Sequence, residues 1–231
     1  MPECRFSLVN LANVYLQQAQ YADAIPLYER ALKIQEKSLG KWHPEAAKTL
    51  GNLAILYKNQ SLYAKAKSLY ERSLKILEKS LGKEHPEVAA TLNNLGELYR
   101  EQGLYAKAEP LYERALKIQE ESLGKAHPEV AKMLNNLADL YKNQDLYAKA
   151  EPLLERSLII KEKSLGEEHP TVATTLANLA EFHEKQNQLA QAEPLIQRAV
   201  GIMEKSAPQH PFTESMRGDL KRIRQAMGRA E

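Results

Sequence analysis

The chain has 231 residues, a formal net charge of +2, 27% charged residues and 43% hydrophobic residues. This composition is that of an ordered protein and argues against disorder. The near balance of charge gives no general reason to expect nucleic acid or an anionic membrane surface as a partner. The single cysteine, Cys4, excludes an internal disulfide framework and a multi-cysteine zinc site, so we expect a reducing, cytoplasmic compartment.

Two targeting signals are missing from the sequence. It has no run of about 18 apolar residues of the kind that spans a membrane. Its first residues, MPECRFSLVN, lack the basic region and the continuous apolar stretch of a signal peptide. We therefore expect no membrane partner.

The dominant feature is a His-Pro dipeptide that recurs every 42 residues and, at its last occurrence, after 41. The dipeptides begin at His43, His85, His127, His169 and His210. Periods of this size indicate repeat architectures. They divide the chain into five units, residues 1–42, 43–84, 85–126, 127–168 and 169–209, followed by a tail, 210–231. Pro2 and Glu3 share the phase of Pro44 and Glu45, which suggests a segment of a longer array, with a short natural protein as the alternative.

Each unit is predicted to form two helices, as the unit 85–126 illustrates. Apolar residues recur at helical spacing after Pro86, which suits the first position of a helix. Gln102-Gly103 interrupts the pattern, and a second apolar-periodic stretch follows. Gly124 is placed to end this second helix in a left-handed conformation.

Small residues recur at three positions of the unit, where two helices are expected to approach closely. The three sets are Ala12, Ala54, Gly96, Ala138 and Ala180; Ala24, Ala66, Ala108, Ala150 and Ala192; and Ala31, Ser73, Ala115, Ser157 and Ala199. Leucines and tyrosines at intervening positions would fill the gaps. Stacked helical hairpins are the economical solution.

These positions resemble the tetratricopeptide repeat signature. The matching residues of the third unit are Leu92, Leu95, Gly96, Tyr99, Tyr105, Ala108, Tyr112 and Ala115. The 42-residue period and the string LNNLGELYREQGLYAKAEPLYERALKIQEESLGKAHPEV are similar to the repeats of kinesin light chain and its bacterial relatives, over residues 1–206. The resemblance implies an all-α, right-handed superhelical solenoid of five hairpins plus a capping helix, 210–231, as one domain over 1–231.

Two departures from the family pattern limit what the resemblance implies. The heptad coiled coil that joins the light chain to the motor heavy chain is absent, so motor attachment is not supported. The fifth unit replaces three signature tyrosines by His183, Leu189 and Ile196.

The tyrosines and histidines could indicate chemistry, but their spacing favours structure. All eleven tyrosines fall at three repeat positions, which is typical of core packing rather than of a stacking surface. Histidines 42 residues apart would lie on adjacent hairpins roughly 10 Å apart, too far to share a zinc ion. They are expected either to cap the first helix or to pack in the turn. The sequence has no nucleophile elbow, phosphate loop, HExxH or CxxC motif, so we expect no catalytic site, metal or cofactor.

A polar stripe on the first helix of each unit is the candidate binding site. Its members are Asn10, Lys48, Asn52, Lys58, Asn59, Asn93, Asn94, Arg100, Lys132, Asn135, Asn136, Lys142, Asn143 and Asn178. By resemblance, this stripe lines a concave groove. Asparagine is a mediocre helix former, and its carboxamide suits the backbone of an extended peptide. The alternative is that these asparagines hydrogen-bond neighbouring repeats.

The expected function is non-catalytic binding of a protein or peptide partner, as an adaptor or scaffold. The stripe carries both signs of charge, and the preference for a weakly acidic peptide rests on the resemblance alone. Two other functions are considered: a structural, self-associating repeat array, and a regulatory segment of a larger signalling protein.

A last helix is predicted over 212–228. Phe212, Met216, Leu220, Ile223 and Met227 form an apolar stripe at spacings of four, four, three and four. Because the end of a repeat array needs a polar outer surface, this helix is expected to be a cap.

Overall fold

The structure is a computed structural model that describes the backbone of residues 2–228 and the side chains of residues 7–228. The side chains of Pro2, Glu3 and Cys4 therefore lie outside the described residues. Within 2–228 the chain forms helices and no strand. The helices are, in chain order, α1 (Pro2–Gln17), α2 (Tyr21–Leu39), α3 (Pro44–Asn59), α4 (Tyr63–Leu81), α5 (Pro86–Glu101), α6 (Tyr105–Leu123), α7 (Pro128–Lys142), α8 (Tyr147–Leu165), α9 (Pro170–Lys185), α10 (Leu189–Ser206) and α11 (Pro211–Ala226).

The His-Pro dipeptides begin helices, as the sequence predicts. In α3, α5, α7, α9 and α11 the histidine is the N-cap and the proline is the first helical residue. The histidine Nδ1 accepts the backbone N–H of the residue two positions later, at 3.1–3.2 Å. This hydrogen bond satisfies one of the free N–H groups at the helix start. The histidines are therefore caps, and their recurrence has a structural cause.

Glycines end four of the second helices, and Gly124 after α6 has a φ of 85°. The other three differ from the expectation in one respect. Gly40, Gly82 and Gly166 have φ of 90–93°, but their ψ of 151–156° is extended. This is not the left-handed helical conformation that the sequence predicts for the glycine position. It is a region of positive φ that is open essentially only to glycine, so the residue type is still required.

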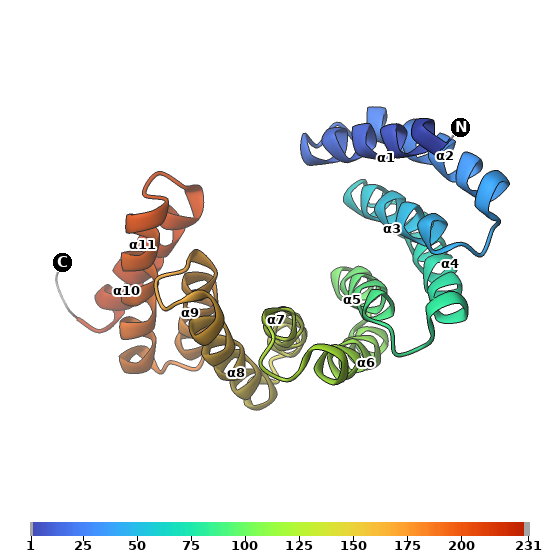
Figure 1. Cartoon of the computed structure of the whole chain (residues 1–231). Helices are drawn as coiled ribbons and strands as arrows, with labels where there is room; N and C mark the ends of the chain where they lie inside the picture. The colour runs from blue at the N-terminus through green and yellow to red at the C-terminus, as the bar shows by residue number, and fades with distance from the viewer. Residues whose placement is uncertain (1, 229–231) are drawn as a thin grey trace. The chain divides into compact units, whose positions relative to one another are not determined.

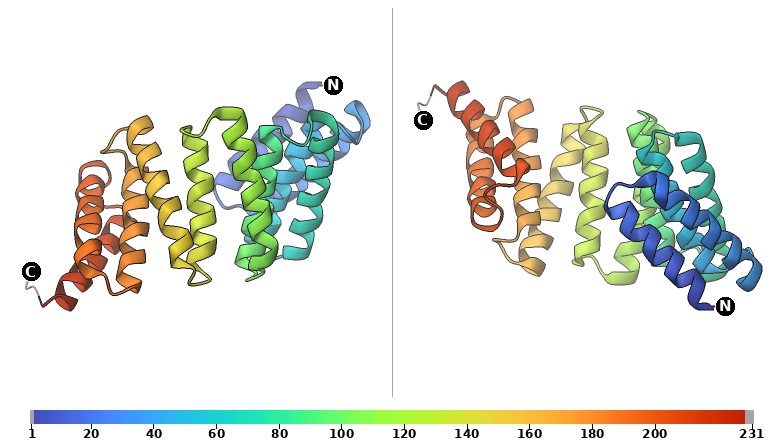
Figure 2. Two further views of the ribbon diagram at one scale, coloured as in Figure 1. Left: turned by 90° about the horizontal axis from the view of Figure 1, so that it is seen from below. Right: turned by 90° about the horizontal axis from the view of Figure 1, so that it is seen from above.

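The small residues hold the two helices of each hairpin together. Ala24, Ala66 and Ala108 are fully buried, and a Cβ added at Gly96 would lie 3.1 Å from the ring of Tyr112. Tyr28 and Tyr70, at the same repeat position as Tyr112, are 0–1% exposed. The tyrosines at this position therefore fill the core, as the spacing predicts. Figure 2 shows that the two helices of each hairpin run antiparallel.

The chain divides into two compact units, Met1–Ser122 and Leu123–Glu231, which are described separately. In unit 1, α2 packs against α3 and α4 packs against α5. In unit 2, α8 packs against α9 and α10 packs against α11. Within unit 1, α3 and α5 lie on one side and α4 and α6 lie on the other (Figure 1). The fold is an all-α series of tandem hairpins of the kind that builds solenoids, while one continuous solenoid over 1–231 stays a prediction.

Arginines on the second helices tie successive hairpins together. Arg114 Nη1 lies 2.8 Å from Glu78 Oε1, and Arg198 Nη1 lies 2.5 Å from Glu162 Oε1. Arg72 pairs with Glu36 in the same way. In each pair the glutamate precedes the arginine by 36 residues. The contact therefore repeats with the period of the sequence.

Helix α11 covers the end of unit 2. Met216 and Ile223 are 0–1% exposed, while Phe212, Leu220 and Met227 are half-buried. All five residues of the predicted apolar stripe thus lie at least half-buried. The predicted terminal helix is confirmed, with its end at Ala226.

Because the hairpin interior is close-packed, we expect Ala108→Leu to overfill it. The larger side chain should lower the free energy of unfolding by about 1–3 kcal/mol. Denaturant titration followed by circular dichroism measures the change. Ala106→Leu, at an exposed position of the same helix, is the control and should leave stability nearly unchanged. Equal stability of both variants would contradict tight packing at Ala108.

Candidate functional site

The predicted site residues all lie on the first helices of the hairpins or at their C-terminal ends. We call this surface the first-helix face, formed by α1, α3 and α5 in unit 1 and by α7 and α9 in unit 2. The exposed members are Asn10, Lys48, Asn59, Lys132 and Asn143. The half-buried members are Asn52, Lys58, Asn93, Asn94, Arg100, Asn135, Asn136, Lys142 and Asn178.

A cavity of about 390 Å³ opens between α3, α4 and α5. It brings three of the predicted residues, Lys48, Asn52 and Asn94, around one space. Gly51 and Leu77 also line this cavity. A Cβ at Gly51 would meet no atom within 4 Å, so the missing side chain leaves open space.

The sequence analysis missed Gly51, Leu77 and a third lining residue, Ile55. Two of these residues, Ile55 and Gly51, could have been found in the sequence because they depart from the repeat. At the position of Ile55 the other units have polar residues, namely Asn13, Glu97, Asp139 and Glu181. At the position of Gly51, the third and fourth units have asparagine. The cavity is therefore more apolar than the repeat pattern predicts.

The asparagines differ in whether their side chains form hydrogen bonds with neighbouring residues. Asn52 Nδ2 donates to Asn13 Oδ1 at 3.2 Å, and the Tyr28 hydroxyl donates to the same oxygen. Asn135 Nδ2 donates to Thr175 Oγ1 at 3.4 Å. Asn94 has no side-chain hydrogen bond to another described residue. Asn52 therefore has the structural role that the sequence analysis kept as an alternative, while Asn94 offers a free carboxamide at the cavity.

Most of the basic residues at the site are neutralised by carboxylates. Lys58 Nζ lies 3.1 Å from Glu97 and 3.0 Å from Glu101, both on α5. Lys142 Nζ lies 2.7 Å from Glu181 on α9. Burial works to raise the pKa of Glu181, but hydrogen bonds and charge from Lys142 and Lys185 outweigh it and lower that pKa. These lysines join successive hairpins.

The lysine at the cavity rim is also paired. Lys48 Nζ lies 3.1 Å from Glu87 Oε1, and the hydrogen bond and charge of Glu87 raise the pKa of Lys48. Lys132, at the same repeat position, pairs with Glu129 of its own helix at 2.6 Å. The first-helix face thus presents ion pairs rather than a row of free cations.

A buried lysine in unit 2 was missed by the sequence analysis. Lys161 of α8 is 6% exposed, and its Nζ donates to Thr175 Oγ1 at 2.7 Å. Burial lowers the pKa of Lys161 to about 8, although the charge of Asp139 opposes the shift. The other units have the uncharged residues Gln35, Leu77, Gln119 and Met203 at this position. A charged amine at this buried position therefore lowers the free energy of unfolding.

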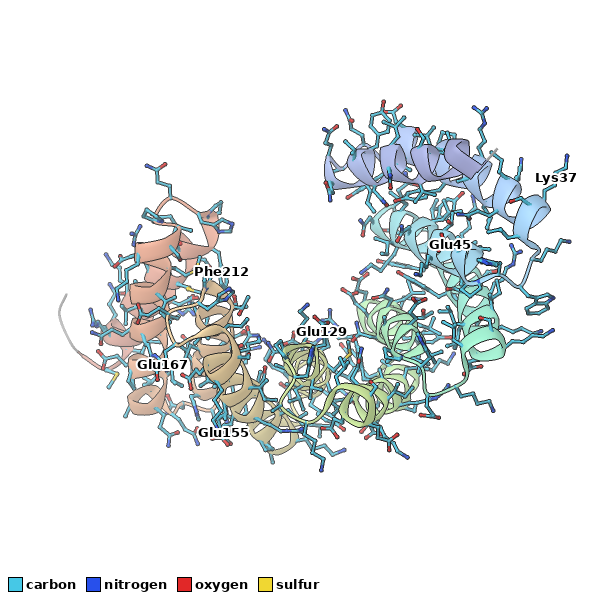
Figure 3. The ribbon with its side chains drawn as sticks, in the orientation of Figure 1. Lys37, Glu45, Glu129, Glu155, Glu167 and Phe212 are labelled. Carbon is cyan, nitrogen blue, oxygen red and sulfur yellow. The ribbon has the colours of Figure 1, made fainter. Side chains whose placement is uncertain are left out.

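Asn178 lines a second cavity, of about 310 Å³, between α9, α10 and α11. Phe212, labelled in Figure 3, belongs to its wall. Arg222 and Glu184 also line it and form a two-fold hydrogen-bonded pair at 2.7 and 2.8 Å. This cavity is closed on one side by the terminal helix.

Two further observations concern the kind of site. Among residues 7–228, no three His, Cys, Asp or Glu side chains gather closely enough to hold a metal ion. None of the helices described is both long and apolar enough to span a membrane.

The family follows from comparison with known proteins. A model of the tetratricopeptide repeat family matches residues 5–79, 45–121 and 129–205. These ranges cover more than half of the chain, which therefore belongs to the tetratricopeptide repeat family. A search of curated proteins gave no match.

Several solved structures are similar to this chain. BtubC (BKLC) from P. vanneervenii has a TM-score of 0.75 and 22% identity, over 97% of this chain and 84% of that chain. A putative kinesin light chain from Podosopora anserina, with nearly identical TPR-like repeats, has a TM-score of 0.75 and 29% identity, over 90% and 98%. RapI, in its apo form, has a TM-score of 0.67 and 18% identity, over 98% and 85%.

These matches confirm a tetratricopeptide repeat protein that resembles kinesin light chain. BtubC and RapI, at their low identities, show the fold alone. The family and its neighbours support a protein-interaction repeat module.

The buried Lys161 should make stability depend on pH. Its folded pKa of about 8 lies below the ordinary value of 10.5, so the folded state binds fewer protons between these pH values. The free energy of unfolding should therefore rise with pH from about 8 upward. In Lys161→Leu this rise should disappear, and the variant should be more stable than the parent at pH 7 by roughly 2–3 kcal/mol.

Urea titrations at pH 7.0, 8.5 and 9.5 test this. The highest pH is kept below 10 because burial raises the pKa of Tyr28 and Tyr70. Above about pH 10 the unfolded state therefore loses these protons first, and the free energy of unfolding falls. Lys163→Leu, at an exposed position of the same helix, is the control. A Lys161→Leu variant with the parent's pH dependence would show that Lys161 stays charged in the folded protein.

Proposed function

We propose that this chain is a non-catalytic protein-binding module that acts as an adaptor or scaffold. It binds an extended peptide segment of a partner protein on the first-helix face of unit 1. The cavity between α3 and α5 carries this proposal, because it joins an apolar floor to a free carboxamide. We further propose a cytoplasmic location, which fits the single cysteine.

The lining of the cavity supports one mode of binding. The half-buried Ile55 and the buried Leu77 suit an apolar side chain of the peptide. Asn94, at the edge of the same cavity, can exchange hydrogen bonds with the peptide backbone through its carboxamide. Backbone contacts supply affinity and the cavity supplies selection, as in other modes of extended-peptide recognition.

The charge of the ligand is the second part of the proposal. Lys48 is an exposed cation at the rim of the cavity, so a weakly acidic peptide is favoured near it. It already has a carboxylate partner, Glu87, at 3.1 Å. The charge selection should therefore be weak and should decrease further with salt.

The test is calorimetric titration with peptides taken from an array of ten-residue sequences that each carry one central apolar residue. Asn94→Ala should weaken binding about 2- to 12-fold, the effect of losing one neutral hydrogen bond. Gly51→Asn, which copies the residue of the third and fourth units, should fill the cavity. It should weaken binding roughly 30-fold if the apolar side chain is the anchor.

Matched controls separate binding from folding. Gly201→Asn makes the same change in α10, where a Cβ likewise meets no atom within 4 Å. It should leave affinity unchanged. Unchanged affinity in both Asn94→Ala and Gly51→Asn, with circular dichroism intact, would place the binding surface elsewhere and overturn the proposal.

A further inference from the structure

Helix α1 exposes two apolar side chains that every other first helix of the repeats buries. Leu11 is 44% exposed and Val14 is 46% exposed. At the same repeat positions, the later units have Leu53, Leu95, Leu137 and Leu179, which are 3–4% exposed, and Leu56, Leu98, Leu140 and Phe182, which are 0% exposed. This part of α1 thus has the composition of a surface that another hairpin covers.

The neighbouring helix carries an arginine that lacks its usual partner. Arg72, Arg114 and Arg198 each pair with a glutamate on the second helix of an earlier hairpin. Arg30 occupies the same position in α2, is exposed, and has no ion pair among the described side chains. An occupant of this surface is therefore expected to present a carboxylate. We call Leu11, Val14 and Arg30 the N-terminal face.

The other end of the array presents the complementary surface, but α11 covers it. Leu220 and Ile223 of α11 follow Leu179 and Phe182 by 41 residues, so they stand at the positions of Leu11 and Val14. Helix α11 packs against α10 as the first helix of a sixth unit would.

The ion pair at this end also follows the pattern of the Glu–Arg pairs between successive hairpins. Glu204 of α10 follows Glu162 by 42 residues and so stands at the position that binds an arginine of the next hairpin. Here Arg217 of α11 binds it at 3.0 Å. We call the surface of α9 and α10 beneath α11, with Glu204, the C-terminal face.

We propose that the N-terminal face binds the C-terminal face of a second copy of this chain, in competition with that copy's own α11. Leu11 and Val14 would take the places of Leu220 and Ile223, and Arg30 would replace Arg217 on Glu204. The occupant is a second copy because its C-terminal face carries, at the repeat position, the carboxylate that Arg30 does not find among the described side chains. Such contacts are heterologous, so they extend head to tail.

Helix α11 is then a cap that keeps the chain monomeric. While it is seated, the C-terminal face is closed. A change that releases α11 allows association without altering either face. This inference does not depend on the proposed peptide site.

Sedimentation velocity over a concentration series tests the competition on the full chain. The parent should stay monomeric, and Ile223→Asp, which places a charge at a buried position of α11, should form oligomers that grow with concentration. Adding Leu11→Asp to this variant should weaken association roughly 30-fold, the effect of losing a central interface residue. Ile159→Asp, at an apolar position of α8 that is 50% exposed, is the matched control and should have no effect.

A charge exchange between copies tests the pairing of Arg30 with Glu204. In the Ile223→Asp background, Arg30→Glu alone and Glu204→Arg alone should each weaken self-association about 2- to 5-fold at low salt. A mixture of the two variants should associate more tightly than either alone, because each contact then joins opposite charges. A mixture that is no tighter would overturn this pairing.

A second variant, which weakens the seating of α11 less severely, is used if Ile223→Asp unfolds the last hairpin. Arg217→Ala with Arg222→Ala removes surface ion pairs of α11 and leaves its buried residues in place. A folded variant of either kind that stays monomeric, or that associates equally well with Leu11→Asp, would overturn the proposal. Association of the parent through Leu11 with α11 seated would overturn the competition.

Discussion

Each hairpin of this chain can bury its apolar surface only against the hairpins before and after it. The two helices of one hairpin close on small residues such as Ala66 and Ala108, which are fully buried. The outer side of the first helix stays open until a neighbour covers it, as Leu53 at 3% exposure and Leu11 at 44% show. Stability therefore depends on the interfaces between hairpins, as in other repeat proteins whose units contact only their neighbours.

The same constraint explains where the polar groups of the first-helix face are used. Lys58 and Lys142 each reach a carboxylate of the following hairpin, at 3.0 and 2.7 Å. Exposed pairs of this kind contribute little individually, but these two lysine side chains are only 11% and 14% exposed. Charges that look like a recognition surface in the sequence thus serve the stacking of hairpins. The cavity between α3 and α5 remains because Gly51 leaves it unfilled.

The helices and their ends were predictable because they rest on local chemistry that repeats. The His-Pro caps, the glycine stops and the buried small residues recur at fixed positions of a 42-residue unit. The individual features of the site were harder to predict, because they depend on single departures from the repeat. Ile55 stands where other units are polar, and Lys161 is the one charged residue at a buried position where the other units have Gln35, Leu77, Gln119 and Met203. A comparison of each unit with the others would have drawn attention to both, but not to the hydrogen bond of Lys161 with Thr175.

The hydrogen bonds and ion pairs between hairpins have a further consequence for how such a chain can change its length. Arg114 with Glu78, Lys58 with Glu97, and Lys142 with Glu181 join residues that are 36, 39 and 39 positions apart. Each span is shorter than one 42-residue unit. Loss or duplication of a whole unit by recombination within the gene would therefore rejoin equivalent partners at every junction. An array built in this way can gain or lose units in evolution while each remaining interface keeps its own chemistry.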